Sequence, residues 1–390
     1  MKKYVSELLM IPGPTPVPNE VALSAAQNMM SHRSKPFMKL MLDLTAKLQK
    51  LLQTKNDVVI LSSSGTGGME AAVASCFSKG DKVLVATVGN FGKRWVKLTK
   101  TFGLDVSVLE YAYGQAVDPS AVKALLAKDT EKKIKGVFFQ MNETSTAVLN
   151  DVEELAKVVR AHGALIIVDA ISGFLSADLK IDEWGLDIVV TGSQKAYMLP
   201  PGLAVVSVSE KAKKAIETSD LPKFYLSLKA ALKDVREGQT PYTPAVGLIY
   251  QLVTAVNMLE KEGLESILAR HERLTKAVRA ALRGLGLKLL NEDDYTASRA
   301  VTAVYPPEGI EADVIRKKMK EEFGITLANG QDELKGKIFR IGHLGYIDPK
   351  DVLAAIACLE IVLSELGAPG IKWGKGVQAV QNILAQKQEA

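Results

Sequence analysis

The sequence predicts an α/β protein with a large domain built on a mostly parallel, seven-stranded sheet covered by helices on both faces, followed by a smaller α+β domain. Up to about residue 240, short apolar runs alternate with longer amphipathic ones, which is typical of parallel strands joined by helices. Beyond that point the pattern changes to a long helical stretch and then to a second set of strands and helices.

Seven apolar runs are the candidate strands of the large sheet. The last two are joined by a short link that contains "LPPG", and a link this short predicts that one of them runs antiparallel. The runs are DVVILS (57–62), DKVLVAT (81–87), DVSVLEY (105–111), KGVFFQM (135–141), ALIIVDA (164–170), DIVVTGS (187–193) and GLAVVSV (202–208).

Helical patterns lie between most of these runs. Examples are "GGMEAAVASCFSKG" and "DVEELAKVVRAHG", and the second of them ends at a glycine in the usual C-cap position. After residue 240 the stretch from "PAVGLIYQ" to "TKAVRAAL" predicts one long helical segment that leads away from the sheet. The second unit has strand-like "RAVTAVYPP" and "KIFRIGHLG" and helical "EADVIRKKMKEEFG" and "PKDVLAAIACLEIVLSEL".

The composition excludes several classes of protein. With 47% hydrophobic residues among 390, the chain can bury a large core, and its net charge of +5 comes from interspersed acids and bases that indicate no nucleic-acid surface. Two isolated cysteines, Cys76 and Cys358, and four scattered histidines give neither a disulfide framework nor metal-ligand spacing. No window approaches the ~20 apolar residues of a membrane span, and the N-terminus lacks a signal-peptide pattern, so we expect a cytoplasmic protein.

Ligands of open α/β sheets bind beyond the carboxyl ends of the strands, so the residues that follow each strand are the candidate site. Ser64, Gly65 and Thr66 follow the first strand where it turns into a helix. Backbone N–H groups and hydroxyls at a helix N-terminus bind anions, and a phosphate suits them best. A simple N-cap with glycines easing the turn explains the same residues equally well.

Asp169 and Lys195 end two further strands. A carboxylate after five apolar residues is costly unless it is paired, and Asp169 fits either a cation-binding role or the commoner role of a helix N-cap. Lys195 follows "DIVVTGSQ", where a desolvated amine would have a lowered pKa and could form a Schiff base. Taken alone, a lysine whose head reaches solvent is the better interpretation.

Together, the three features point to a cofactor. A phosphate turn, a carboxylate and a lysine at neighbouring strand ends are the set that pyridoxal 5′-phosphate requires. The turn binds its phosphate, the carboxylate pairs with its pyridinium nitrogen, and the lysine reacts with its aldehyde. No metal site is expected.

The order and spacing of the motifs resemble those of the class V aminotransferases of fold-type I, close to the alanine–glyoxylate and serine–pyruvate aminotransferase group. The resemblance extends over nearly the whole chain. Its most specific parts are "SGTGGMEAA", "NETSTA", "VDAISG", "GSQKA" followed by "LPPG", and "RIGHLG".

This resemblance implies a role for residues at the cofactor phosphate. Ser64, Gly65, Thr66 and Gln194 would contact the phosphate group. In "GQTPYTPAVG" (238–247), Thr243 matches a threonine that reaches the phosphate of the neighbouring subunit, which implies a homodimer with shared active sites. A tyrosine found three residues upstream in some relatives is Thr240 here, with Tyr242 as a possible replacement. A proline-punctuated start of the long helix explains this segment equally well.

Other residues would contact the cofactor ring. Phe91 falls where the family places a stacked aromatic ring, often Trp, although an ordinary core phenylalanine is the better interpretation from the pattern alone. Thr144 would lie near the phenolic oxygen, its alternative being a loop threonine. Asp169 would pair with the pyridinium nitrogen, and Lys195 would form the Schiff base.

The substrate would be held by the second domain and the N-terminal arm. Arg340, inside the apolar strand "KIFRIGHLG", would bind the substrate α-carboxylate, with a structural ion pair as the alternative. Pro12 and Gly13 would line the side-chain pocket, whereas His32 and Arg33 are given no role. The implied organisation is an arm over the active site (1–14), a large cofactor-binding domain (15–255) and a small C-terminal domain (256–390).

The function expected from the resemblance is ping-pong transamination between alanine or serine and glyoxylate or pyruvate. Aspartate as donor and a pyridoxal-phosphate lyase stay open as alternatives. A cysteine desulfurase is disfavoured, because Cys76 and Cys358 lie in apolar helical stretches rather than on an exposed loop. A cofactor-binding regulator is disfavoured too, since the chain has no residues left over for a DNA-binding module.

Overall fold

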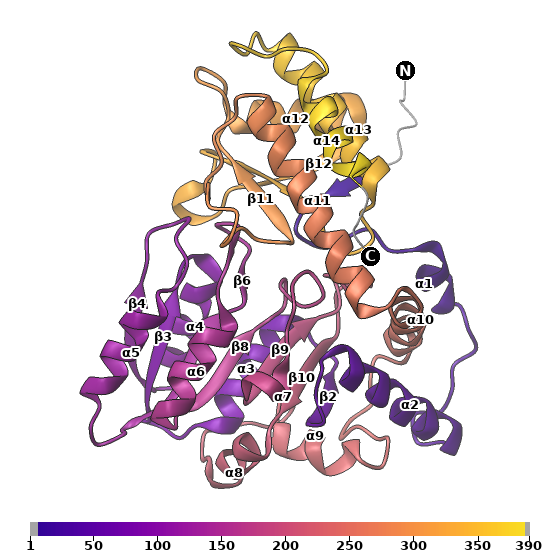
Figure 1. Cartoon of the computed structure of the whole chain (residues 1–390). Helices are drawn as coiled ribbons and strands as arrows, with labels where there is room; N and C mark the ends of the chain where they lie inside the picture. The colour runs from indigo at the N-terminus through magenta and orange to yellow at the C-terminus, as the bar shows by residue number, and fades with distance from the viewer. Residues whose placement is uncertain (1–6, 387–390) are drawn as a thin grey trace.

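Residues 7–386 are described by the computed structural model and form two units, a large one around a wide sheet and a smaller one above it in Figure 1. The wide sheet has the order β2-β10-β9-β8-β5-β3-β4. Strand β10 is antiparallel to both neighbours and the other pairs are parallel, which confirms the interpretation of "LPPG". Each predicted run forms one strand: β2 (Asp57–Leu61), β3 (Lys82–Thr87), β4 (Asp105–Glu110), β5 (Ile134–Gln140), β8 (Leu165–Asp169), β9 (Ile188–Gly192) and β10 (Ala204–Val208).

Helices cover both faces of this sheet because successive strand residues point to opposite sides. In β5, Val137 and Phe139 join the core under α2, α5, α6 and α10, whereas Phe138 joins the core under α3, α4, α8 and α9. A short hairpin, β6 (Asn142–Glu143) and β7 (Val148–Leu149), follows β5. The helices are α1 (Asn19–Ser24), α2 (Lys35–Leu51), α3 (Gly65–Cys76), α4 (Asn90–Thr101), α5 (Pro119–Lys128), α6 (Val152–His162), α7 (Ile181–Trp184), α8 (Glu210–Thr218), α9 (Leu228–Val235) and α10 (Val246–Glu262).

The smaller unit is a four-stranded sheet, order β1-β12-β13-β11, packed against helices. Strands β11 and β13 and helices α12 and α13 confirm the sequence patterns, whereas β1 and β12 were not expected from the sequence. The elements are β1 (Leu8–Met10), β11 (Val301–Val304), β12 (Ile325–Asn329), β13 (Phe339–Gly342), α11 (Leu264–Gly284), α12 (Ala312–Phe323), the 3-10 turn η1 (Asp332–Leu334), α13 (Pro349–Glu365) and α14 (Lys375–Ala385).

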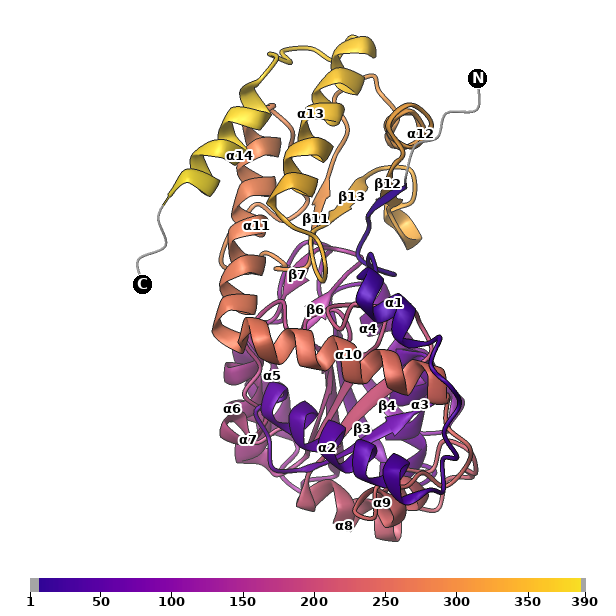
Figure 2. The ribbon, with the colours of Figure 1, turned by 90° about the vertical axis from the view of Figure 1, so that its right-hand side faces the viewer.

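The long helical stretch is two helices and not one, which corrects the sequence prediction. Gly263 breaks it with φ 84° and ψ 140°, a conformation that glycine adopts readily. Figure 2 shows the result: α10 lies across the large unit, and α11 rises from its end into the small unit. Arg270 spans the break, because it pairs with Glu262 at 2.6 Å and donates to the carbonyl of Gly345 at 2.8 Å.

The N-terminal arm is part of the small sheet. Strand β1 pairs in parallel with β12, with Leu8 opposite Ile325. Just after β1 the backbone passes so close to Gly342 that a Cβ there would lie 2.2 Å from the carbonyl atoms of Ile11. The arm therefore enters the molecule against β13 before it turns toward the large sheet.

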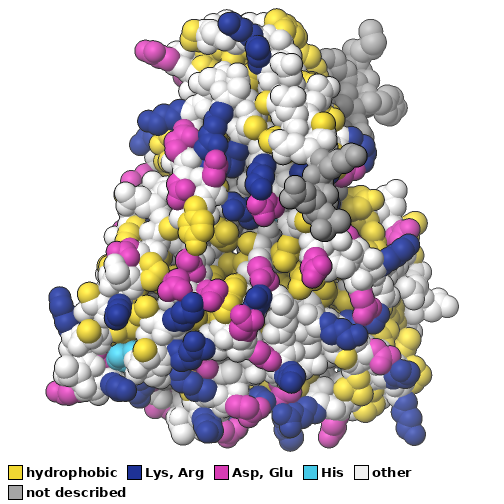
Figure 3. Space-filling model, viewed as in Figure 1, with side chains coloured by type: hydrophobic (Ala, Val, Ile, Leu, Met, Phe, Trp, Pro, Cys, Tyr) yellow, Lys and Arg dark blue, Asp and Glu magenta, His cyan; other side chains and the backbone are white. Residues whose placement is uncertain are grey.

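Basic and acidic side chains are interspersed on the face of the molecule in Figure 3. Within residues 7–386, no helix is both long enough and apolar enough to cross a membrane.

We predict that Gly342→Ala destabilises the protein by forcing the arm away from β13. Overpacking of this kind lowers the free energy of unfolding by about 1–3 kcal/mol, to be measured by urea denaturation. Gly247→Ala is the matched control, because Gly247 lies in α10 with nothing within 4 Å of its would-be Cβ. Equal effects of the two substitutions would contradict the proposed clash.

Candidate active site

The predicted site residues meet at the carboxyl edge of the large sheet. Asp169 ends β8, Lys195 follows β9, and Ser64 to Thr66 follow β2. Gly65 permits this convergence, since a Cβ at that position would lie 2.5 Å from the side chain of Ile171, two residues after Asp169. The start of α3 therefore lies directly against the segment that carries the carboxylate.

The turn at Ser64 is open to an anion. Ser64 is the N-cap of α3, yet its side chain makes no capping hydrogen bond, so the interpretation as a simple N-cap is not supported. The first N–H groups of a helix have no partner within it, and here they lie at the edge of the crevice. Helix α3 begins at Gly65, slightly earlier than the sequence suggested.

Asp169 is buried, with one carboxylate oxygen accepting from the backbone N–H of Ile171 at 2.9 Å. Burial raises the pKa of this carboxyl from 3.8 to about 7, because a desolvated carboxylate is costly. No other hydrogen bond from the described residues reaches the carboxylate. A cationic nitrogen placed opposite it would therefore be strongly favoured.

Lys195 is buried as well, with only 9% of its surface exposed. Its Nζ donates to the carbonyl of Pro12 at 2.5 Å, so the side chain does not extend to solvent. Burial lowers the pKa of the amine to about 8, and the nearby Asp169 opposes part of that shift. At neutral pH the neutral, nucleophilic form is far more populated than in an exposed lysine.

The backbone around Lys195 is held from two sides. Thr15 of the arm donates its hydroxyl to the carbonyl of Lys195 at 2.9 Å and its N–H to the carbonyl of Gln194 at 3.1 Å. From the small unit, Gly345 lies so near that a Cβ would approach the same carbonyl to 3.2 Å. Gly13 is also confined, because its would-be Cβ lies 2.6 Å from the Lys195 Nζ. These contacts of Thr15 were not predicted from the sequence.

Glu143 fixes the start of α4, which carries Phe91. Its carboxylate is fully buried and accepts from the backbone N–H groups of Phe91 and Gly92, both at 3.0 Å, and from the hydroxyl of Ser145 at 2.6 Å. Burial raises the pKa of Glu143, and these hydrogen bonds offset part of that effect. Sequence reasoning missed Glu143, because its neighbours in "NETSTA" are polar and do not indicate that it is buried.

Arg340 on β13 links the small unit to the site. It is buried, and it donates to the carbonyls of Asn329 and Thr144, both at 2.8 Å. No carboxylate of the described residues forms an ion pair with it, which argues against the structural alternative. Burial lowers the pKa of its guanidinium to about 10. Its remaining N–H groups can hold a planar carboxylate.

Two further side chains complete the crevice. Thr144 lies in the turn between β6 and β7, and its buried hydroxyl is 2.6 Å from that of Ser172. The Oε1 atom of Gln194 is buried without a hydrogen-bond partner. An orphaned acceptor of this kind at the sheet edge indicates that a ligand group completes its hydrogen bonding.

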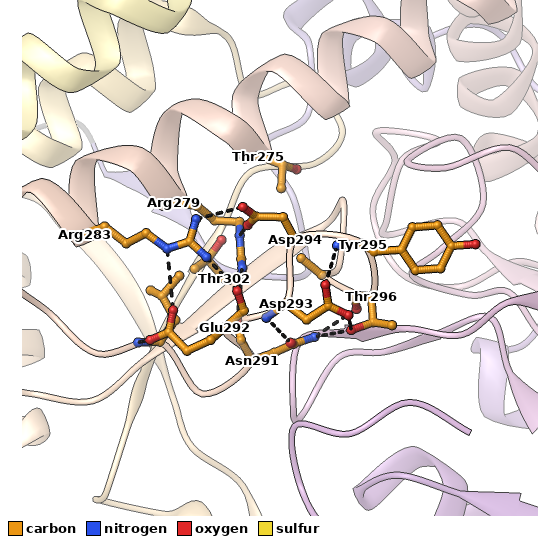
Figure 4. Close-up of polar contacts among 12 residues, drawn as sticks. Thr275, Arg279, Arg283, Asn291, Glu292, Asp293, Asp294, Tyr295, Thr296 and Thr302 are labelled. Atoms are coloured by element: carbon orange, nitrogen blue, oxygen red, sulfur yellow. Dashed lines mark hydrogen bonds and ion pairs between the residues drawn. The ribbon is translucent and has the colours of Figure 1, made fainter. Parts of the chain in front are cut away.

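A loop of the small unit (291–299) reaches the hairpin that follows Thr144. Its N–H and carbonyl groups bond to the hairpin, with Ser298 donating to Ala147 at 3.0 Å. As Figure 4 shows, Arg279 and Arg283 of α11 hold this loop through Asp294, at 2.6 and 2.9 Å. The β6–β7 hairpin that carries Thr144 belongs to the large unit and is hydrogen-bonded to this loop of the small unit.

The chain matches the sequence profile of the class V aminotransferases over residues 19–339. It belongs to this family.

Individual relatives match this chain over almost its full length. The chain is 49% identical to a protein named soluble hydrogenase, small subunit, from Synechococcus sp. (strain PCC 6716), covering 97% of this chain and 98% of that protein. It is 38% identical to serine–glyoxylate aminotransferase of Hyphomicrobium methylovorum, over 98% and 95%. The crystal structure of pyridoxamine–pyruvate aminotransferase from Mesorhizobium loti superposes with a TM-score of 0.93 at 29% identity, covering 98% of both chains.

Class V aminotransferases depend on pyridoxal 5′-phosphate, and the residues of this site fit that cofactor. The open turn at Ser64–Thr66 suits its phosphate, to which the amide N–H groups of Gln194 could donate, and the Asp169 carboxylate suits its ring nitrogen. Phe91 is half-buried with its ring beside Arg94, so part of this side chain lies outside the core. Within the described part of this aminotransferase, no cluster of three or more His, Cys, Asp or Glu could hold a metal.

The segment around Thr243 lies at the surface of this aminotransferase subunit. Thr243 is exposed, and no hydrogen bond joins it to Ser64, Gly65 or Thr66 of its own chain. The hydroxyl of Thr240 donates to the carbonyl of Tyr242 within the segment. Arg33 has a structural part, since it donates to the carbonyls of Thr240 and Pro241.

The raised pKa of Asp169 predicts a pH dependence of stability in the cofactor-free enzyme. Between its ordinary value of 3.8 and about 7, only the folded state keeps the proton, so stability falls as pH rises through that interval. Asp169→Asn has no proton to lose, so wild type should lose stability relative to this variant from about pH 4 to about pH 7. Thermal unfolding midpoints across that interval test this, and parallel curves would contradict it.

Proposed function

We propose that this enzyme transfers the amino group of a small L-amino acid, alanine or serine, to glyoxylate or pyruvate by a ping-pong reaction. The observation that carries the proposal is the buried Lys195 amine, with the Asp169 carboxylate and the free edge of Arg340 around it. When bound, pyridoxal phosphate supplies an aldehyde that carries the amino group and a ring that accepts electrons. The residues supply binding, orientation and proton transfer.

Lys195 has two tasks in this proposal. Its neutral Nζ would hold the cofactor through the aldehyde, and once free of the cofactor, the same Nζ would remove the proton from the substrate α-carbon. An amine with a pKa of about 8 can both accept and return that proton near neutral pH. The Asp169 carboxylate would hold the ring nitrogen of the cofactor and would favour its protonated form.

Arg340 orients the substrate. All amino acids and 2-oxo acids of this reaction carry a carboxylate next to the reacting carbon, and a guanidinium binds it in a planar, two-point geometry. With Arg340 fixed to the carbonyls of Asn329 and Thr144, the bound substrate would present its α-carbon to Lys195. Pro12 and Gly13 close the space over the Lys195 amine, which favours small side chains. Aspartate as donor and a lyase reaction are the remaining alternatives.

Cysteine chemistry is poorly supported. The Cys76 thiol is buried in α3, where burial raises its pKa to about 12. Cys358 lies on α13 of the small unit, and burial raises its pKa too. Neither thiol is near Lys195 in the fold, so a desulfurase is disfavoured. Two thiols in separate units also offer no four-cysteine iron–sulfur site, so the hydrogenase name of one relative is not carried over.

We further propose a cytoplasmic homodimer in which Thr243 completes the site of the neighbouring subunit. Beside the exposed Thr243, the surface carries an aromatic cluster of Phe224, Tyr225 and Tyr242, with ring centroids 5.4 Å apart in two pairs. Phe224 is 77% exposed, and large apolar side chains gathered on a surface indicate an interface. This cluster supports the proposed contact between subunits.

Replacement of Lys195 tests the reaction. Lys195→Ala should lower turnover of alanine and serine by about 10²–10⁴-fold or more, because the general base is lost. Borohydride should attach the cofactor to Lys195 in wild type, and peptide mapping should find no such attachment in the variant. Lys39→Ala, with a side chain 77% exposed, is the control and should keep full activity. Normal turnover by Lys195→Ala would overturn the proposal.

Mixed subunits test the shared site. Thr243→Ala should weaken cofactor binding several-fold, and sedimentation should give twice the 42.1 kDa chain mass. Co-refolding Thr243→Ala with Lys195→Ala chains should restore one intact site in each mixed dimer. Tight cofactor binding should then return at one of the two sites of each mixed dimer. No recovery, or a monomer in sedimentation, would argue that each subunit has a complete site of its own.

A further inference from the structure

We propose that Arg94 is a positioning residue of the cofactor site, which holds the Phe91 ring and the Thr66 hydroxyl in place for pyridoxal phosphate. Arg94 lies one turn after Phe91 on α4, and neither the sequence motifs nor the comparisons assign it a role. This inference rests on the cofactor-binding roles proposed above for Phe91 and Thr66.

Arg94 contacts both residues at once. Its guanidinium carbon lies 4.7 Å from the centroid of the Phe91 ring, within the range of a cation–π contact. Its Nη1 donates to the hydroxyl of Thr66 at 2.9 Å. A single side chain therefore connects the residue that would stack on the cofactor ring with the turn that would bind its phosphate.

The backbone of Phe91 is already fixed, but its ring is not. Glu143 accepts from the N–H groups of Phe91 and Gly92, and a Cβ on Gly92 would lie 2.1 Å from the Thr87 hydroxyl. These contacts determine where α4 begins. The ring itself is only half-buried, so the orientation of its face depends on a side-chain neighbour, and Arg94 is placed to supply it.

The charge of Arg94 is available to a ligand. Among the described residues no carboxylate pairs with it, although it is half-buried in a protein with many ion pairs. Its positive charge acts on the crevice. Burial is the main cause of the lowered pKa of Lys195, and the charge of Arg94 lowers that pKa further. The same charge opposes the rise that burial causes in the pKa of Asp169. A phosphate monoester carries about −1.5 to −2 charges at neutral pH, and a cation beside the Ser64–Thr66 turn adds to the attraction of the helix N-terminus.

Lysine is a poor substitute in such a position. A guanidinium is planar, so it can stack on an aromatic ring while its edge donates a hydrogen bond, whereas an ammonium is a point charge on a flexible stem. The geometry therefore predicts that charge alone does not satisfy the site. This difference between arginine and lysine separates a positioning role from simple electrostatic attraction.

The test measures cofactor binding rather than turnover. Cofactor-free wild type, Arg94→Gln and Arg94→Lys are titrated with pyridoxal phosphate, and the dissociation constant and the visible circular dichroism of the bound cofactor are recorded. We expect the dissociation constant to rise at least tenfold in Arg94→Gln and severalfold in Arg94→Lys, with altered dichroism in both. Lys97→Gln, which removes an exposed charge from the same helix, is the control and should bind as wild type.

A double-mutant cycle with Phe91→Leu completes the test. If Arg94 acts through the ring, the losses from Phe91→Leu and Arg94→Gln are not additive. Wild-type affinity and dichroism in Arg94→Gln, or additive losses, would overturn the inference. Failure of both Arg94 variants to fold would overturn it too, because it would assign the residue to stability. Failure of wild type itself to bind the cofactor would instead refute the proposed function.

Discussion

The desolvation of the Lys195 amine is the constraint on which the rest of the site depends. An ammonium group is stable in water, and a chain that buries one must either pair it or accept the neutral form. Here the amine lies against the arm, at the carbonyl of Pro12 and at Gly13, and near the carboxylate of Asp169, while Gly345 of the small unit packs against the backbone carbonyl of Lys195. Each of these neighbours comes from a different part of the chain, so the reactivity of one side chain requires the whole fold to be in place.

A second constraint is the close approach of separate backbone segments around the site. Gly65 brings α3 against Ile171, Gly92 brings α4 against Thr87, and Gly345 brings the small unit against Lys195. At each position a methyl group would occupy the space of a neighbouring atom. The glycines in "SGTGG", "NFGK" and "RIGHLG" thus serve chiefly to let separate elements meet at the sheet edge, and the polar side chains beside them form the site.

The large sheet could be predicted from sequence because its central strands are covered on both faces and read as uninterrupted apolar runs. Asp169 and Lys195 could be predicted for the same reason, since a charged residue at the end of such a run stands out. Strands β1 and β12 could not, because β1 has three residues and pairs with a segment at the other end of the chain. Glu143, Thr15 and Arg94 were missed since their partners are distant in sequence. The break at Gly263 was missed because helices tolerate an isolated glycine.

The membership of β1 in the small sheet has a consequence for how the polypeptide is assembled. The large sheet takes its strands from one continuous stretch, from Asp57 to Val208, and the helices α9 and α10 that follow this stretch complete the cover of its faces. The small sheet needs segments far apart in the chain: its edge strand, β1, precedes the whole large sheet, and the partner of β1, β12, follows that sheet by more than a hundred residues. During synthesis β1 cannot pair with β12 until β12 has been made. Until that pairing forms, it cannot hold Pro12 beside Lys195. The surroundings of the Lys195 amine are therefore completed late, and activity requires that the last third of the chain has been synthesised.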